Sequence, residues 1–118
     1  MIEELLMRGA DDWVTAAEVA WVAKSMGGSA TDDGKRDIAF KLIRQVLEMG
    51  LMKAGDVTEG GFSAWELSPA ESFARIEREW RSLGRIPEIG EVAWLANTPS
   101  GSRRAEALFS KGGTDGPL

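Results

Sequence analysis

Carboxylates are the side chains of this sequence that are best suited to chemistry or to binding a charged partner. Paired carboxylates can act as general acid and base, hold magnesium, or form an acidic surface. The chain has no His, Cys or Tyr, which removes the commonest general base, thiol nucleophiles, disulfides and Cys/His zinc sites. We therefore expect no enzyme activity, no metal site and no cofactor. Six acids lie in expected loops, turns or helix starts: Asp11, Asp12, Asp32, Asp33, Asp56 and Glu59.

The net charge of −5 comes from the N-terminal third of the chain. Residues 1–34 hold seven acids against Arg8 and Lys24, whereas residues 35–118 hold twelve acids and twelve bases. Acids at helix starts complement the helix dipole and keep a protein soluble, so each acid taken alone has an ordinary structural explanation. The cluster as a whole favours a basic partner.

Trp13 is the aromatic residue that we expect to anchor such a contact. It stands beside Asp11 and Asp12 in a connector between two expected helices, and tryptophan is enriched among residues that dominate interfaces. The expected partner-binding residues are therefore Trp13 and the six acids named above. The other four tryptophans occupy expected helix or strand positions, where core packing is the ordinary explanation; they are Trp21, Trp65, Trp80 and Trp94.

The connector that carries Trp13 is expected between two helices. Apolar spacing over residues 2–6 predicts a short first helix that ends at Gly9. A capping box formed by Thr15 and Glu18 then predicts a second helix over residues 16–26.

Two longer helices are predicted around the Gly-rich stretch at residues 54–61. Asp32 or Asp33 is expected to cap the third helix, which Gly50 ends. The sequence SPAE at 68–71 predicts the start of a fourth helix that ends at Gly84.

The C-terminal part is expected to be helical and then to become an exposed tail. A helix is predicted from Pro87 to Leu95, with one or two further helical turns over residues 102–109. EVAWVA at 18–23 recurs as EVAWLA at 91–96. Because the flanking residues disagree, we interpret this recurrence as two similar short helices rather than as an internal duplication.

The strands that the sequence predicts are expected to form a single hairpin. Residues 51–53 and 64–67 are predicted as strands around a loop of about eight residues, a length typical of a wing. The predicted fold is thus mainly α with a small two-stranded β-hairpin, a winged-helix-like single domain. We expect this domain to span residues 1–110, with a C-terminal tail over residues 111–118.

One set of residues carries a resemblance to a known family: Gly50, Leu51, Met52, Gly55, Asp56, Val57, Gly61, Phe62, Trp65, Trp80, Leu83, Gly84, Pro87, Gly90, Glu91, Trp94, Leu95, Asn97 and Thr98. At these positions the chain resembles a family of small bacterial winged-helix-like proteins whose functions are largely uncharacterised. The resemblance extends over most of residues 11–98 and implies no catalytic residues. Compact acidic domains of this size also resemble, more loosely, immunity proteins that neutralise secreted toxins, including those of contact-dependent inhibition.

Two functional hypotheses follow from the residues and the resemblance. The first is a non-catalytic protein-binding domain, such as an immunity protein that covers the nucleic-acid surface of a basic toxin with carboxylates. The alternative is a winged-helix DNA-binding regulator that uses Lys35, Arg36, Lys41 and Arg44 of the third helix, with Lys53 near the wing. No apolar run is long enough to cross a membrane, and the N-terminus lacks a secretion signal, so we expect a cytoplasmic protein.

Overall fold

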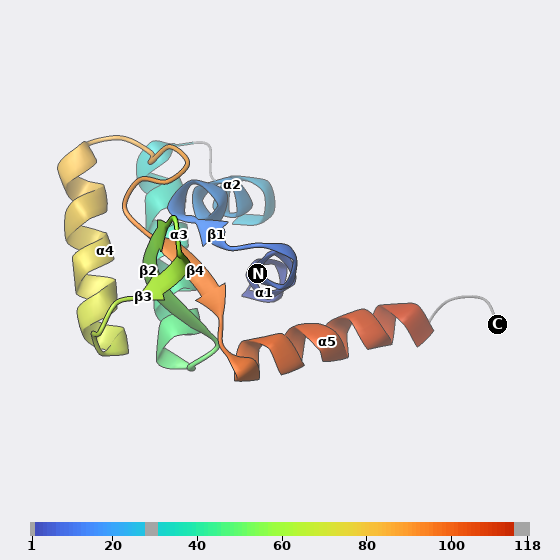
Figure 1. The fold of residues 1–118 in the computed structure, drawn as a ribbon. Helices are drawn as coiled ribbons and strands as arrows, with labels where there is room; N and C mark the ends of the chain where they lie inside the picture. The colour runs from blue at the N-terminus through green and yellow to red at the C-terminus, as the bar shows by residue number, and fades with distance from the viewer. Residues whose placement is uncertain (1, 28–30, 115–118) are drawn as a thin grey trace.

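The computed structural model describes residues 2–27 and 31–114. Within this part of the chain, five helices surround one four-stranded antiparallel sheet (Figure 1). The expected mainly α, winged-helix-like fold with a single two-stranded hairpin is therefore wrong, and the fold is α/β. The elements follow the order α1 (Ile2–Asp11), β1 (Val14–Thr15), α2 (Ala16–Gly27), α3 (Asp32–Glu48), β2 (Met52–Thr58), β3 (Gly61–Ala64), α4 (Pro69–Leu83), β4 (Trp94–Asn97) and α5 (Pro99–Thr114).

The sheet joins segments that are far apart in the sequence. Its strand order is β1-β4-β2-β3, so the late strand β4 lies between β1 and β2. Val14 of β1 pairs with Leu95 of β4, and Leu95 also pairs with Ala54 of β2. All three residues are buried, and they belong to the sheet face that packs on the helices.

The helix expected from Pro87 to Leu95 is wrong, because none of these residues is helical and Trp94 and Leu95 belong to strand β4. Leu95 is buried whereas its neighbours Trp94 and Ala96 are only partly buried, which is the alternation of a strand with one covered face. β4 is paired on both sides. Its backbone groups therefore obtain their hydrogen bonds from neighbouring strands, and this tertiary pairing outweighs the helical pattern of the sequence.

The hairpin is longer and its turn is tighter than expected. β2 and β3 pair from Gly55 with Ala64 to Thr58 with Gly61, leaving Glu59 and Gly60 as the turn. The predicted loop of about eight residues is wrong because most of that loop is strand. Gly61 has φ 104°, a conformation that favours glycine and permits this turn.

Two of the three predicted helix starts are confirmed. Thr15 Oγ1 accepts a hydrogen bond from the Glu18 N–H at 3.1 Å. Ser68 and Glu71 form the complete capping box of α4. The third helix is capped by Thr31 instead of Asp32 or Asp33, because the Thr31 hydroxyl accepts the Gly34 N–H at 3.0 Å and both aspartates lie inside the first turn.

α1 continues past Gly9, where the sequence predicted its end. A Cβ at Gly9 would lie 2.3 Å from Asn97 Oδ1, so this glycine allows α1 to pass close to β4 rather than ending the helix. α5 is also longer than expected, since it starts after Thr98 and continues through residues 111–114 of the expected tail. Residues 115–118 of that tail lie outside the described residues.

The core lies between the sheet, α1, α2 and α3, and it extends to the contact between α3 and α4. At that contact Phe40 meets Phe73 and Trp80 edge to face, with ring centroids 5.9 and 5.3 Å apart. Trp80 is buried, as expected. The core assignment of Trp21 is wrong, because its side chain is 54% exposed and lies 4.7 Å from the Arg8 guanidinium carbon.

Candidate functional site

The last residue of α1 and the two-residue connector to β1 present two carboxylates and an indole ring to solvent. Asp11 and Asp12 are exposed, and Trp13 is 37% exposed. The Trp13 N–H donates to Asp12 Oδ1 at 2.7 Å, which fixes the aspartate against the backbone of the connector. The next residue, Val14, is fully buried, so β1 anchors the end of the connector in the core.

Trp13 packs on the β2–β3 hairpin. Its ring stacks on Phe62 with centroids 6.3 Å apart and planes 30° apart. The edge of the same indole lies 3.8 Å from the position that a Gly61 Cβ would occupy. Phe62 in turn lies over Gly55, where a Cβ would be 2.8 Å from the Phe62 Cζ atom. The absence of a side chain at Gly55 therefore allows Phe62 to lie flat on the sheet as a support for Trp13.

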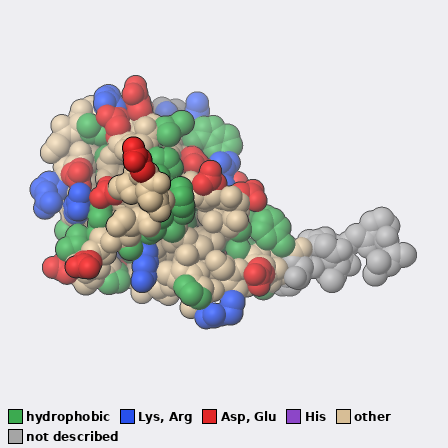
Figure 2. All heavy atoms as spheres, in the orientation of Figure 1, with side chains coloured by type: hydrophobic (Ala, Val, Ile, Leu, Met, Phe, Trp, Pro, Cys, Tyr) green, Lys and Arg blue, Asp and Glu red, His purple; other side chains and the backbone are tan. Residues whose placement is uncertain are grey.

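The turn of the β2–β3 hairpin, on which Trp13 packs, carries a further acid, Glu59. Glu59 is exposed in the turn, two residues before Gly61, which Trp13 contacts. Asp11, Asp12 and Glu59 form no ion pair with another described residue. We call Asp11, Asp12, Trp13, Glu59 and Phe62 the acidic face. Figure 2 shows acidic and hydrophobic side chains next to one another in the middle of the view, and further acidic side chains along the outline together with most of the visible Lys and Arg side chains.

Asp56 is part of the same hairpin but points to different neighbours. Its carboxylate accepts a hydrogen bond from Trp65 Nε1 at 3.0 Å. Arg75 of α4 lies over the Trp65 ring, with its guanidinium carbon 3.8 Å from the centroid. Asp56 therefore orients an indole and lies near a cation, so its role is local and it is not a member of the acidic face.

Asp32 and Asp33 are separated from the connector by the length of α2. A helix of twelve residues spans about 18 Å. Asp32 pairs with Lys35 at 3.7 Å, and Asp33 pairs with Arg36 at 3.4 Å. Both line a small hollow of about 180 Å³ that also contains Arg81 and Arg85. Their charge is offset locally, so the structure does not bring these two predicted residues to the acidic face.

The sequence analysis missed Phe62 as a member of the site. Phe62 was noted only as a matching residue of the resemblance, because nothing local in the sequence pairs it with a connector some fifty residues earlier. The alternation of β3 would have placed it on the opposite sheet face from Ser63. The contact with Trp13 is visible only in the structure, because β1 and β3 lie at opposite edges of the sheet and the Trp13 ring nevertheless stacks on Phe62.

The acidic face offers negative charge and an aromatic surface. Among residues 2–27 and 31–114, no three acids come close enough to hold a metal ion. None of the helices in the described part of the chain is long and apolar enough to span a membrane.

Comparisons of the chain with protein-family models, with curated proteins and with solved structures return no match. The resemblances to small bacterial proteins and to immunity proteins therefore stay predictions. The function is argued below from the geometry of the chain.

Proposed function

We propose that this protein is a non-catalytic domain that binds a basic protein through the acidic face. The observation that carries the proposal is the contact between Trp13 and Phe62, which joins the segment that follows Asp11 and Asp12 to the hairpin whose turn carries Glu59. Both rings are partly exposed. The class of partner that fits this surface is a cationic protein domain, such as a toxin nuclease whose basic nucleic-acid surface would be covered.

The aromatic pair and the carboxylates have different physical roles in this proposal. A tryptophan supported by a second ring offers a large, rigid contact area whose ordering costs little entropy. Carboxylates without ion-pair partners attract a cationic surface over about a Debye length and raise the association rate by about 10- to 1000-fold. The partner would thus be steered by Asp11, Asp12 and Glu59 and held by Trp13.

The bases of α3 weigh against the alternative of a DNA-binding regulator. Arg36 contacts both Asp33 and Asp37, and Arg44 pairs with Glu48 at 2.9 Å. Lys35 pairs with Asp32, so three of the five bases named for this alternative are offset by acids and only Lys41 and Lys53 form no ion pair with a described residue. Phosphate contacts dominate affinity for DNA, and this offset weakens them. The winged-helix fold on which that alternative depended is also not the fold observed.

Binding to a panel of purified basic protein domains, including nuclease toxin domains, tests the proposal. The test variant carries Asp11→Asn, Asp12→Asn and Glu59→Gln, and association rates are measured by biolayer interferometry at about 50 mM and about 300 mM salt. We expect the variant to associate at least about tenfold more slowly than the wild type at low salt, with a smaller difference at high salt. Trp13→Ala should instead increase the dissociation rate.

A second variant with Asp32→Asn and Asp33→Asn serves as the control, because it removes carboxylates outside the acidic face. We expect its association rate to change by less than about threefold, since these carboxylates are already paired with Lys35 and Arg36. Equal losses in the test and control variants would refute a localised site. The absence of binding to any basic domain at low salt would reject the proposal itself.

A further inference from the structure

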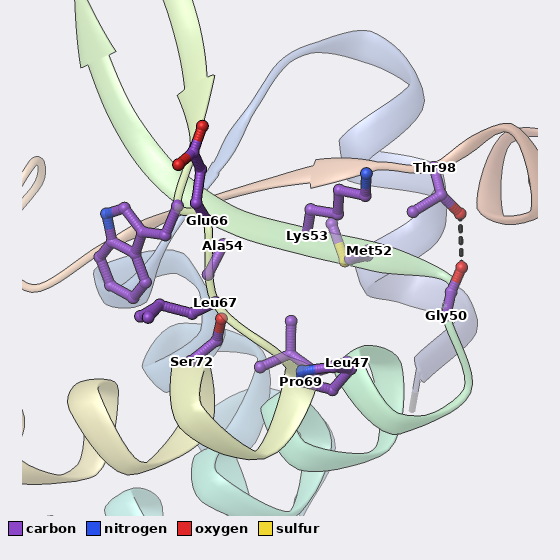
Figure 3. Close-up of a pocket in the computed structure, with 11 residues that line it drawn as sticks. Leu47, Gly50, Met52, Lys53, Ala54, Glu66, Leu67, Pro69, Ser72 and Thr98 are labelled. Atoms are coloured by element: carbon purple, nitrogen blue, oxygen red, sulfur yellow. Dashed lines mark hydrogen bonds between the residues drawn. The ribbon is translucent and has the colours of Figure 1, made fainter.

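A cavity of about 340 Å³ opens at the start of β2, far along that strand from the hairpin turn. Its walls come from the end of α3, from β2, and from the segment that joins β3 to α4 (Figure 3). In Figure 3 Leu47, Leu67 and Pro69 gather on one side of β2, whereas Lys53 and Glu66 point away from them. The cavity therefore has an apolar interior and a charged mouth.

The backbone of Met52 points into this cavity without a partner. Hydrogen bonds alternate sides along a strand. The Leu51 carbonyl accepts the Thr98 N–H on the β4 side, whereas the Ala54 carbonyl accepts the Trp65 N–H on the β3 side, both at 3.0 Å. The Met52 N–H and carbonyl must therefore face the β3 side. No other described residue hydrogen-bonds to them there.

The pairing between β2 and the chain after β3 stops at this point. Trp65 lies opposite Ala54, so a continued ladder would place Glu66 opposite Lys53 and Leu67 opposite Met52. Lys53 and Glu66 form no ion pair with each other or with another described residue. The two segments have separated instead, and the cavity occupies the space between them.

Ser72 adds a polar group to the apolar wall. Its side chain lines the cavity, and the residue is only 5% exposed. The peptide group of Met52 is the group that lacks partners here. A buried peptide group without partners is costly, and a bound group that supplies hydrogen bonds to Met52 would remove this cost.

We propose that the cavity binds an extended peptide segment of another protein, which adds to the free edge of β2 at Met52. One residue of the peptide donates its N–H to the Met52 carbonyl and accepts the Met52 N–H with its own carbonyl. Register partners point to the same sheet face, so the side chain of that residue enters the cavity between Leu47 and Leu67. A branched apolar side chain such as leucine fits this position.

Charge complementarity specifies the preceding peptide residue. In an antiparallel addition that residue lies opposite Lys53, on the outer sheet face, with Glu66 on the other side of the mouth. A side chain between an ammonium and a carboxylate is best matched by an amide, because its oxygen accepts from Lys53 and its nitrogen donates to Glu66. The recognised sequence is therefore Gln or Asn followed by a branched apolar residue.

Titration of the ¹⁵N-labelled protein with the blocked peptide acetyl-Thr-Gln-Leu-Thr-amide tests this proposal. We expect saturable shifts of the backbone amides of Met52, Ala54 and Leu67, with a Kd on the order of 1 mM. N-methylation of the leucine removes the bond to Met52 and should weaken binding about tenfold. N-methylation of the following threonine is the matched control, because its N–H points away from β2, and should change the Kd by less than about threefold.

Protein variants separate the cavity from other apolar surfaces. Leu67→Ser removes part of one wall and should weaken binding by about fivefold or more, whereas Ile89→Ser alters a residue outside the cavity and should leave the Kd unchanged. Leu67 is 39% exposed and Ile89 is 78% exposed, so neither substitution disturbs the core. Equal effects of the two N-methylated peptides would overturn strand addition. The absence of shifts around Met52 would overturn the site.

Discussion

Thr98 joins the start of α5 to the sheet, and its hydroxyl offers a direct test of how this helix is held. Thr98 Oγ1 donates to the Gly50 carbonyl at 2.6 Å and accepts the Gly101 N–H at 3.1 Å. Loss of a helix cap costs about 0.5–2 kcal/mol, and loss of an ordinary hydrogen bond costs about 0.5–1.5 kcal/mol. We therefore expect Thr98→Ala to lower the free energy of unfolding by about 1–3 kcal/mol.

Urea unfolding followed by tryptophan fluorescence measures this change, and Thr98→Ser is the matched control. Serine keeps the hydroxyl that caps the helix, so its cost should stay below about 0.5 kcal/mol. Hydrogen exchange at the amide of Ala105, a residue buried on α5, reports whether the helix detaches locally before the domain unfolds. Equal stability of the Ala and Ser variants would refute the role given to the hydroxyl.

Three further predictions test other parts of the fold. Gly84→Ala should destabilise the protein by about 1 kcal/mol, because φ is +67° at an open position, whereas Gly60→Ala should cost less, and urea unfolding compares the two. Two bonds from Arg85 and one from the Glu88 N–H lower the pKa of Glu91 to about 2. A carboxylate whose pKa is lowered by folding stabilises the folded state, so the contribution of these hydrogen bonds is complete above about pH 4.5 and is lost as the pH falls through about 2. Arg85→Gln should move the NMR titration midpoint of Glu91 back towards 4.5. Trp80→Ala should cost about 3–5 kcal/mol in urea unfolding, because the indole is buried between α3 and α4, and a cost below about 1 kcal/mol would contradict that packing.

The capping signals of the sequence predicted helix starts well, but the strands were decided by distant partners. EVAWVA at 18–23 lies within α2, whereas the closely similar EVAWLA at 91–96 leads into β4. The first copy follows the Thr15 cap, and no such cap precedes the second. The second copy is instead paired with β1 and β2. Local propensity could not distinguish the two because the pairing partners lie about 40 and 80 residues away.

The same limit explains which part of the candidate site was predicted. Asp11, Asp12 and Trp13 are consecutive, so their association was visible in the sequence. The assignment of Glu59 to the same face depends on the two-residue turn and on the stacking of Phe62 on Trp13, and neither could be read from the local sequence. The capping role expected for Asp32 or Asp33 belongs to Thr31, a difference of one residue, and local ion pairs with Lys35 and Arg36 offset the charge of both aspartates.

β2 connects the two surfaces for which we propose partners. Its first residues border the cavity, and its last residues support the turn that carries Glu59. Seven residues of extended strand span about 20 Å, so the two occupants would not touch each other. Gly55 lies between the two sites, where Phe62 and the β3 backbone leave no room for a Cβ. The apolar side chains of the cavity lie on the same sheet face as Met52 and Ala54, whereas Phe62 lies on the opposite face with Val57. The backbone of β2 around Gly55 is therefore the direct covalent connection between the two sites.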